Sequence, residues 1–378
     1  MHFFTFATED TVLYEASESN NFGLDEIIEV RKDVDDAGVS VNVSRILARF
    51  DLQAMSQSVV RANAGATAKY YLNMYDAGSD NLTTSQSLYA YPTSGSWNMG
   101  RGKTTYSPAE TEGCSWAYRT GQNEETYWTK ADIKDTGGAW ISGSGYEASQ
   151  SFIHTDTELD MRMDVTDIVN KWFSNNITNN GFMVKRSGSI GNNNVLLDEG
   201  SSTQLGNFKF FSRDTHTIYS PRLEAVWNSH VWNTGSLQKL DASDLEDLQI
   251  YMKNIRPEYK EKSKAKFRLV GRGRYPTKSY SNTSSPYLTS KYLPSGSKLV
   301  NDGAYYSVVD ADTKDVIIPF STGSLISCDS DGNYFNLWMN GLQSERYYKF
   351  EFKVVSGSNT TEEMVNYFDD DFTFKVVR

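Results

Sequence analysis

The hydrophobic pattern changes its period between residues 159 and 173, and this change predicts the local order of elements. From 159 to 165 apolar residues alternate with charged ones, which places one apolar face on a strand. The apolar residues then recur at intervals of three and four, which predicts a short helix near 165–173; they are Val165, Ile168, Val169 and Trp172. We expect the side chain of Asp164 or Thr166 to accept a hydrogen bond from the first free N–H groups of this helix.

A turn and another strand follow the predicted helix. The run Asn179-Asn180-Gly181 is typical of a turn with positive φ, and residues 182–185 return to a strand pattern. We expect this strand, helix, turn and strand to lie across one end of an antiparallel sandwich. Trp172 is then a core residue.

Alternation with period two predicts strands along the whole chain, and the fold class is therefore all-β. The expected strands of the first part are 11–14, 26–31, 44–52, 68–75, 87–92, 206–212 and 221–227. Those of the second part are 247–255, 265–271, 305–309, 316–319, 325–328, 334–339, 347–355 and 372–377. About seven strands at this short spacing favour an immunoglobulin-like β-sandwich over 247–378. Residues 229–246 are expected to form a linker.

Composition and charge exclude some classes of function. The net charge of −11 argues against a nucleic-acid-binding protein, which needs a positive surface to displace counterions from phosphate. Cys114 and Cys328 are the only cysteines, so we expect no disulfide framework and no thiolate metal site. The N-terminus lacks the pattern of a signal peptide, and no apolar run approaches the ~18 residues of a membrane span, so we expect neither export nor a membrane.

A long Gly/Ser/Thr-rich stretch at 93–150 carries the candidate ligand-binding residues, which are Trp97, Tyr106, Trp116, Trp128 and Trp140. Aromatic faces are flat and apolar with a polar rim, and this suits stacking against sugars. The alternative, which we favour, is that the tryptophans fasten the stretch to its own domain, because large aromatic side chains are commonly buried.

Several acidic turns are candidate cation sites, but the simpler prediction for each is a solvated hairpin tip. Asp329–Asn333 resembles the start of a calcium loop but has Asn340 where a bidentate Glu is needed, and Asp-Gly is also a hairpin turn. The other clusters are Asp310, Asp312 and Asp315, and Asp369 to Asp371. We expect no metal and no cofactor.

No catalytic motif accompanies the four histidines, so we expect no enzyme, although paired carboxylates for glycoside hydrolysis stay open. A local basic stretch, with Lys266, Arg268, Arg272 and Arg274, favours contact with an acidic neighbouring subunit over nucleic acid.

The run VTDIVNKW at 165–172, followed by NNGFMVK at 179–185, is similar to the signature of the disaggregatase-related (DNRLRE-type) β-sandwich domains. The resemblance covers about residues 10–228. Further matching segments are Asn20-Asn21-Phe22-Gly23, Arg45 with Phe50-Asp51-Leu52, Trp97 with Gly100 and Gly102, Thr111 to Trp116, Gly137 to Trp140, Phe210 to Asp214, and Pro221 to Trp227. Trp227 departs from the family, which usually has Tyr there.

The resemblance implies that residues 1–228 form a jelly-roll platform, sometimes sugar-binding, without catalysis. The part from 248 to 378 looks like the end of virion structural proteins of marine tailed phages (cyanophage-like myoviruses). Together the two resemblances imply a virion structural protein of the tail, neck or baseplate, assembled in the host cytoplasm. It would act through interfaces with other virion proteins, as a homo-oligomer or symmetric assembly. The alternatives are a carbohydrate-binding adhesin that contacts host surface glycan, and a glycan-degrading enzyme.

Overall fold

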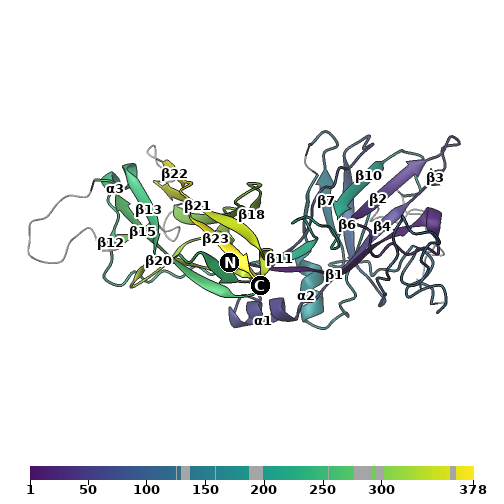
Figure 1. Ribbon diagram of the computed structural model, residues 1–378, viewed down its shortest axis with the longest axis horizontal. Coiled ribbons are helices and arrows are strands. Elements are labelled where there is room, and N and C mark those ends of the chain that lie inside the picture. Colours follow the sequence, from purple (N-terminus) through teal and green to yellow (C-terminus); the bar gives the residue numbers. More distant parts are fainter. Residues whose placement is uncertain are drawn as a thin grey trace, which may run out of the picture. The chain divides into compact units, whose positions relative to one another are not determined.

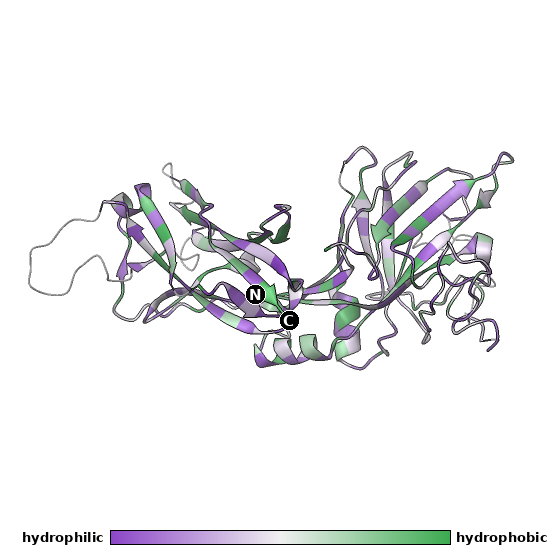
Figure 2. Cartoon of the chain, viewed as in Figure 1, coloured by the Kyte–Doolittle hydropathy of each residue, from purple (hydrophilic) through white to green (hydrophobic). Residues whose placement is uncertain are grey.

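The computed structural model describes residues 1–124, 126–128, 137–157, 159–186, 199–253, 255–275, 291–294, 302–357 and 363–378. It is mostly β, with several antiparallel sheets and few helices (Figure 1), and this confirms the prediction of a β-rich fold. Apolar and polar residues alternate along many strands (Figure 2), as the period of two requires. The chain divides into two compact units.

Unit 2 comprises Phe4–Ser58 and Lys69–Ala225, and its largest sheet has eight strands. Their order in the sheet is β7 (Ala148–Phe152), β6 (Gln86–Pro92), β9 (Phe182–Lys185), β4 (Ser44–Phe50), β1 (His2–Tyr14), β11 (Arg222–Val226), β5 (Lys69–Met74) and β8 (Met161–Asp164). A second sheet contains β10 (Gly206–Phe211), β2 (Ile27–Val34) and β3 (Ser40–Val41).

The eight-stranded sheet is nearly closed, and one side chain joins its two outer strands. Gln150 on β7 accepts a hydrogen bond from the backbone N–H of Arg162 on β8, at 2.8 Å, and donates one to the carbonyl of Asp160, at 3.2 Å. The amide side chain therefore takes the place of a strand partner at this edge, where unpaired backbone groups would otherwise remain.

Unit 1 comprises Met1–Phe3, Val59–Ala68 and Val226–Arg378 and contains two sheets of six strands. The first contains β12 (Gln238–Lys239), β16 (Lys291–Tyr292), β15 (Lys264–Gly273), β20 (Gly332–Trp338) and β19 (Ser327–Asp329), with β13 (Leu248–Lys253) also paired to β15. The second contains β14 (Glu258–Lys260), β23 (Thr373–Val377), β21 (Arg346–Ser356), β17 (Gly303–Asp310) and β18 (Val316–Ile318), with β22 (Met364–Phe368) also paired to β21.

Aromatic rings join the two sheets of unit 1. Phe267 on β15 contacts Phe350 on β21 edge to face, with ring centroids 4.8 Å apart. Tyr306 on β17 stacks on Phe335 of β20 at 4.2 Å. All four side chains are buried, so this layer of rings is the core between the sheets.

The residues predicted as a linker, 229–246, contain secondary structure. Trp232 forms a parallel bridge with Cys328, β12 pairs with β16, and residues 242–246 form the helix α3 (Ala242–Glu246). Because backbone hydrogen bonds attach this segment to the first sheet of unit 1, the segment is an ordered part of that unit.

The short helix predicted near 165–173 is present, but it is not the only helix in the described residues. Helix α2 (Thr166–Phe173) lies there, and the described residues also contain α3 and α1 (Gln53–Arg61). Helix α1 is polar apart from a narrow apolar stripe, including the buried Met55 and Val59, so its signal is weak. The long stretch 93–150 also ends in a strand, β7, that was not predicted.

Trp172 on α2 is buried and contacts Phe182 of β9, with ring centroids 4.6 Å apart. We predict that Trp172→Ala lowers the free energy of unfolding by about 3–5 kcal/mol, because it leaves a large cavity. Asn170→Ala, on the exposed side of the same helix, should stay within about 0.5 kcal/mol of the wild type. Urea unfolding measures both, and an equal, small effect of the two variants would contradict the core assignment.

Asp10 on β1 is a carboxyl group buried in unit 2, where it accepts a hydrogen bond from the backbone N–H of Arg213 at 2.6 Å. Burial raises the pKa of Asp10 from 3.8 to about 7. The folded state therefore holds a proton that the unfolded chain has released, and the stability contributed by this group is lost as pH rises from about 4 to about 7.

We predict that Asp10→Asn removes this part of the pH dependence. The amide oxygen can still accept from the Arg213 N–H group, while no charge forms. At pH 8 the variant should be more stable than the wild type by up to about 4 kcal/mol, and at pH 4 the difference should vanish. Denaturant unfolding at several pH values tests this, and a constant difference between pH 4 and pH 8 would refute it.

Candidate functional site

The tryptophans proposed as ligand contacts lie inside unit 2. Trp97, Trp116 and Trp128 are buried, and Trp140 is half-buried beside them. They share a core cluster whose other members are Leu13, Val43, Leu47, Met99, Cys114, Ala139 and Met183. The buried indoles have no face open to a sugar, and they fasten the 93–150 stretch to β1, β4 and β9.

The indole N–H groups of two of these residues also bind backbone. Trp97 donates to the carbonyl of Asn180 at 2.7 Å, and Trp128 donates to the carbonyl of Ser115 at 2.8 Å. A buried indole needs such a partner, and here the partner is in each case a loop of the same unit. These bonds fix the loops to the core.

Arg45 on β4 lies at the centre of this aromatic cluster. Its guanidinium carbon is 4.7 Å from the ring centre of Trp116 and 5.3 Å from that of Trp140. Its terminal nitrogen is 2.7 Å from the carboxylate of Glu199, and both side chains are only 4% exposed. It also donates to the carbonyl of Gly137. One buried cation therefore joins three loop segments to the sheet.

Gly137 and Gly138 let the backbone approach this cation. Both have positive φ, at 90° and 93°, which favours glycine. A Cβ on Gly137 would lie 2.7 Å from the Trp116 ring, so the site has no room for a side chain. This explains the Gly-Gly-Ala-Trp run at 137–140 in structural terms.

Asn21 is a buried residue that the sequence prediction did not single out. Its side chain donates to the carbonyls of Met99, at 2.7 Å, and Cys114, at 2.8 Å, and accepts from the N–H of Gly102, at 2.8 Å. It therefore joins the loop after β1 to two turns of the 93–150 stretch. The only sequence signal was its place in an Asn-Gly loop.

Tyr106 is the one proposed residue that is largely exposed, at 47%. Two further tyrosines in the same stretch were not singled out. Tyr127 is 52% exposed, and its ring centroid lies 4.8 Å from that of Tyr118. Tyr106 and Tyr127 are therefore the exposed aromatic side chains in the described part of this stretch, while Tyr118 and Trp140 are half-buried.

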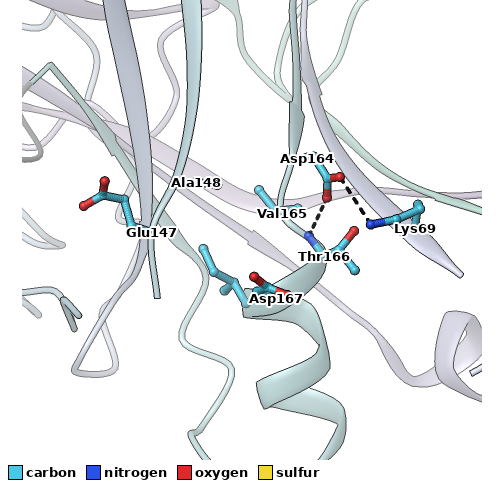
Figure 3. Close-up of a pocket in the computed structure, with 8 residues that line it drawn as sticks. Lys69, Glu147, Ala148, Asp164, Val165, Thr166 and Asp167 are labelled. Atoms are coloured by element: carbon cyan, nitrogen blue, oxygen red, sulfur yellow. Dashed lines mark hydrogen bonds and ion pairs between the residues drawn. The ribbon is translucent and has the colours of Figure 1, made fainter. Parts of the chain in front are cut away.

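A small polar pocket lies at the start of α2 (Figure 3). Lys69, Glu147, Asp164 and Asp167 line it with a volume of about 130 Å³, well below the ~300–1,000 Å³ of ordinary ligand sites. Asp164 accepts from the N–H of Thr166 at 3.0 Å, as predicted, and lies 3.8 Å from the Lys69 amine. Its carboxylate therefore binds the first N–H group of the helix and also forms an ion pair with Lys69.

The Thr166 hydroxyl, the other predicted cap, accepts from the backbone N–H of Tyr70 instead, at 3.0 Å. This bond ties the first turn of α2 to β5. Of the two candidates, Asp164 alone therefore accepts a hydrogen bond from the helix N-terminus, at the N–H of Thr166.

The acidic turns of unit 1 bind their own chain. Asp329 accepts hydrogen bonds from Arg268, at 2.8 and 2.9 Å, and from Lys266, at 2.8 Å. These bonds, led by that from Arg268, hold the pKa of Asp329 well below its usual range. For Lys266 and Arg268 of the basic stretch, the acidic partner therefore comes from the same chain. Asp329 also pairs with Gly332 across the predicted hairpin.

The other two acidic clusters are engaged in a similar way. Asp310 accepts from Arg346 at 2.8 Å and from the N–H groups of Asp312 and Thr313, both at 3.0 Å. Lys349 forms ion pairs with Asp369 and Asp371. Across the residues that the structure describes, no group of three or more His, Cys, Asp or Glu side chains is arranged to hold a metal ion.

No protein-family model matches the chain, and no curated protein is significantly similar to it in sequence. The resemblance to the disaggregatase-related domains therefore stays a prediction from motifs. In the described part of the chain, none of the helices has the length and apolar character needed to cross a bilayer.

We predict that Arg45→Met lowers the free energy of unfolding by about 3–5 kcal/mol, since it removes the guanidinium that pairs with the buried Glu199 carboxylate. Adding Glu199→Gln to that variant should recover part of the loss, because the buried side chain that lost this partner then carries no charge. The matched control is Arg31→Met, which removes the more exposed pair with Asp33 and should cost less than about 1 kcal/mol. Equal losses in the two single variants, measured by denaturant unfolding, would contradict the account.

Proposed function

We propose that the protein is a structural component of a tailed-phage particle, in the tail, neck or baseplate, and that it acts through protein–protein interfaces. In this proposal unit 2 is a jelly-roll sandwich, unit 1 is an immunoglobulin-like sandwich, and the protein assembles on the particle with other virion proteins and with copies of itself. In this proposal host carbohydrate is an additional ligand and not the main partner.

The observation that carries the proposal is the structural role of the motif residues. The segments that resemble the disaggregatase-related domains supply the buried frame of unit 2, including Arg45, Trp97, Trp116 and the Gly137–Trp140 turn. These buried side chains make unit 2 rigid. A rigid unit suits a platform that positions surfaces, because precise assembly needs a scaffold whose side chains are held in place by packing.

Unit 1 presents surfaces of the kind that partners use. Val365 and Tyr367 on β22 are 42% and 65% exposed, and Val316 on β18 is 56% exposed. Tyr367 also contacts the half-buried Phe320, with ring centroids 6.0 Å apart. Apolar and aromatic side chains at a sheet margin are typical of protein interaction sites.

Mass spectrometry of purified particles tests the proposal. The phage whose genome encodes this chain should carry the protein at a fixed stoichiometry after density-gradient purification. Absence from intact particles that infect normally would refute the assignment.

A variant refines this test by targeting the interface itself. Val365→Asp, complemented in trans, should lower incorporation into particles at least tenfold while the purified protein remains folded. Val39→Asp, at a residue of unit 2 that is 56% exposed, is the control and should be incorporated normally. Equal incorporation of both variants would contradict a role for β22 in assembly.

A further inference from the structure

Strand β22 is an open margin of the second sheet of unit 1. It pairs with the end of β21, from Phe352 to Ser356 (Figure 1), and within the described residues no strand pairs with its other side. The side chains of Val365 and Tyr367 on this strand are exposed. An open margin presents backbone N–H and C=O groups with which another strand can pair.

The hydrogen bonds of β21 show which backbone groups of β22 face outward. The N–H of Phe350 donates to the carbonyl of Phe372 at 3.1 Å, which is the side of β21 on which β22 and β23 lie. Backbone groups alternate between the two sides of a strand, so the even-numbered residues of β21 face β22. Their partners on β22 are Met364, Asn366 and Phe368. The N–H and C=O groups of Val365 and Tyr367 therefore point away from β21.

The sequence of β22 is complementary to itself. Residues 364–368, MVNYF, carry no charge. When a second copy lies antiparallel, with a two-fold axis at Asn366, Val365 lies opposite Tyr367 of the second copy. Each such pair can exchange the backbone hydrogen bonds that are open in the single chain. A β-branched side chain opposite an aromatic ring is also a favourable cross-strand pair.

The other margins of this sheet carry features that oppose such pairing. Strand β14 has Glu258 and Lys260, both exposed, and β18 is followed directly by Pro319. Charged residues and prolines at a margin hinder the addition of a strand from another molecule. Strand β22 has neither, so it is the margin of this sheet that is suited to a partner strand.

The charges at the ends of β22 are compatible with this arrangement. In the same register, Glu363 of one copy lies beside Asp369 of the other. Asp369 forms an ion pair with Lys349 of its own chain, so Glu363 meets a paired carboxylate and not an isolated charge. The two-fold pairing therefore brings no unpaired like charges directly together.

We propose that two copies of the protein associate through antiparallel pairing of β22 about a two-fold axis, which continues the second sheet of unit 1 from one copy into the other. This inference rests on the proposed function for the role of β22 as an interface, and it names a second copy as the partner. Because the paired strands are short, we expect a Kd on the order of 10 μM in solution. Association strengthens where copies are held close together on a particle.

Sedimentation velocity of the purified full-length protein, from about 1 to about 200 μM, tests the proposal. The wild type should pass from monomer to dimer and no further, because a two-fold interface is closed. Val365→Pro should weaken dimerisation at least tenfold, because it removes an N–H that faces the second copy. The fold should tolerate this change, since that N–H does not face β21, and thermal unfolding checks it.

Two further variants test the location and the register of the pairing. Val316→Asp changes a valine of similar exposure at the β18 margin and should leave dimerisation unchanged. Asn366→Cys should give a disulfide-linked dimer with oxidised glutathione, because the two copies of residue 366 face each other at the axis. The native Cys114 and Cys328 are buried and should not cross-link.

A wild-type protein that stays monomeric over this concentration range would overturn the pairing, as would equal dimerisation of Val365→Pro and the wild type. Particle mass spectrometry separates this result from the proposed function. A monomeric protein that is present in particles refutes the pairing alone, and a dimer that is absent from particles refutes the proposed function alone.

Discussion

The buried pair of Arg45 and Glu199 is the interaction on which the architecture of unit 2 depends. Removing a guanidinium and a carboxylate from water is costly, and the cost is offset only where both are paired and hydrogen-bonded. Here the cation meets a carboxylate, a backbone carbonyl and two indole faces at once. All of these partners belong to loops outside β4, so the loops must be in place before the charge is satisfied.

This constraint explains why a long stretch with little regular structure is ordered in its described parts. Glycine and serine are frequent between 93 and 150, and a loop of that length is otherwise expected to be mobile or functional. Its tryptophans enter the core, its turns bind Asn21, and the Gly137–Trp140 turn closes on Arg45. The aromatic side chains of this stretch that remain exposed in its described part are Tyr106 and Tyr127.

Local periodicity was sufficient to predict most strands and α2, since a period of two or of 3.6 is visible within a few residues. It also located the hairpin at Asp329–Asn333. Helix α1 was missed because its apolar stripe is narrow, and β7 because its sequence, ASQSF, is mainly polar. Which sheet a strand joins is decided by contacts distant in sequence, as between β2 and β10.

The aromatic residues show that contacts distant in sequence also limit what can be predicted about a functional site. Sequence identifies them as large and amphipathic but cannot say which face inward, because burial depends on segments far along the chain. Trp97 is buried although its neighbour Asn98 is exposed, and the backbone of Asn98 is bonded to Arg119 and Cys114, contacts that no local pattern encodes. The candidate residues were therefore found, while their roles as anchors or as exposed surface came from the structure.

Hydrogen–deuterium exchange across the 93–150 stretch tests most directly the claim that it is a buried frame. The amides of Cys114 and Gly137 donate to the carbonyls of Asn98 and Trp116, both at 2.6 Å, within the tryptophan cluster. The account predicts that peptides containing these amides exchange as slowly as those from β4 and β9. Exchange as rapid as that of an open loop would contradict it.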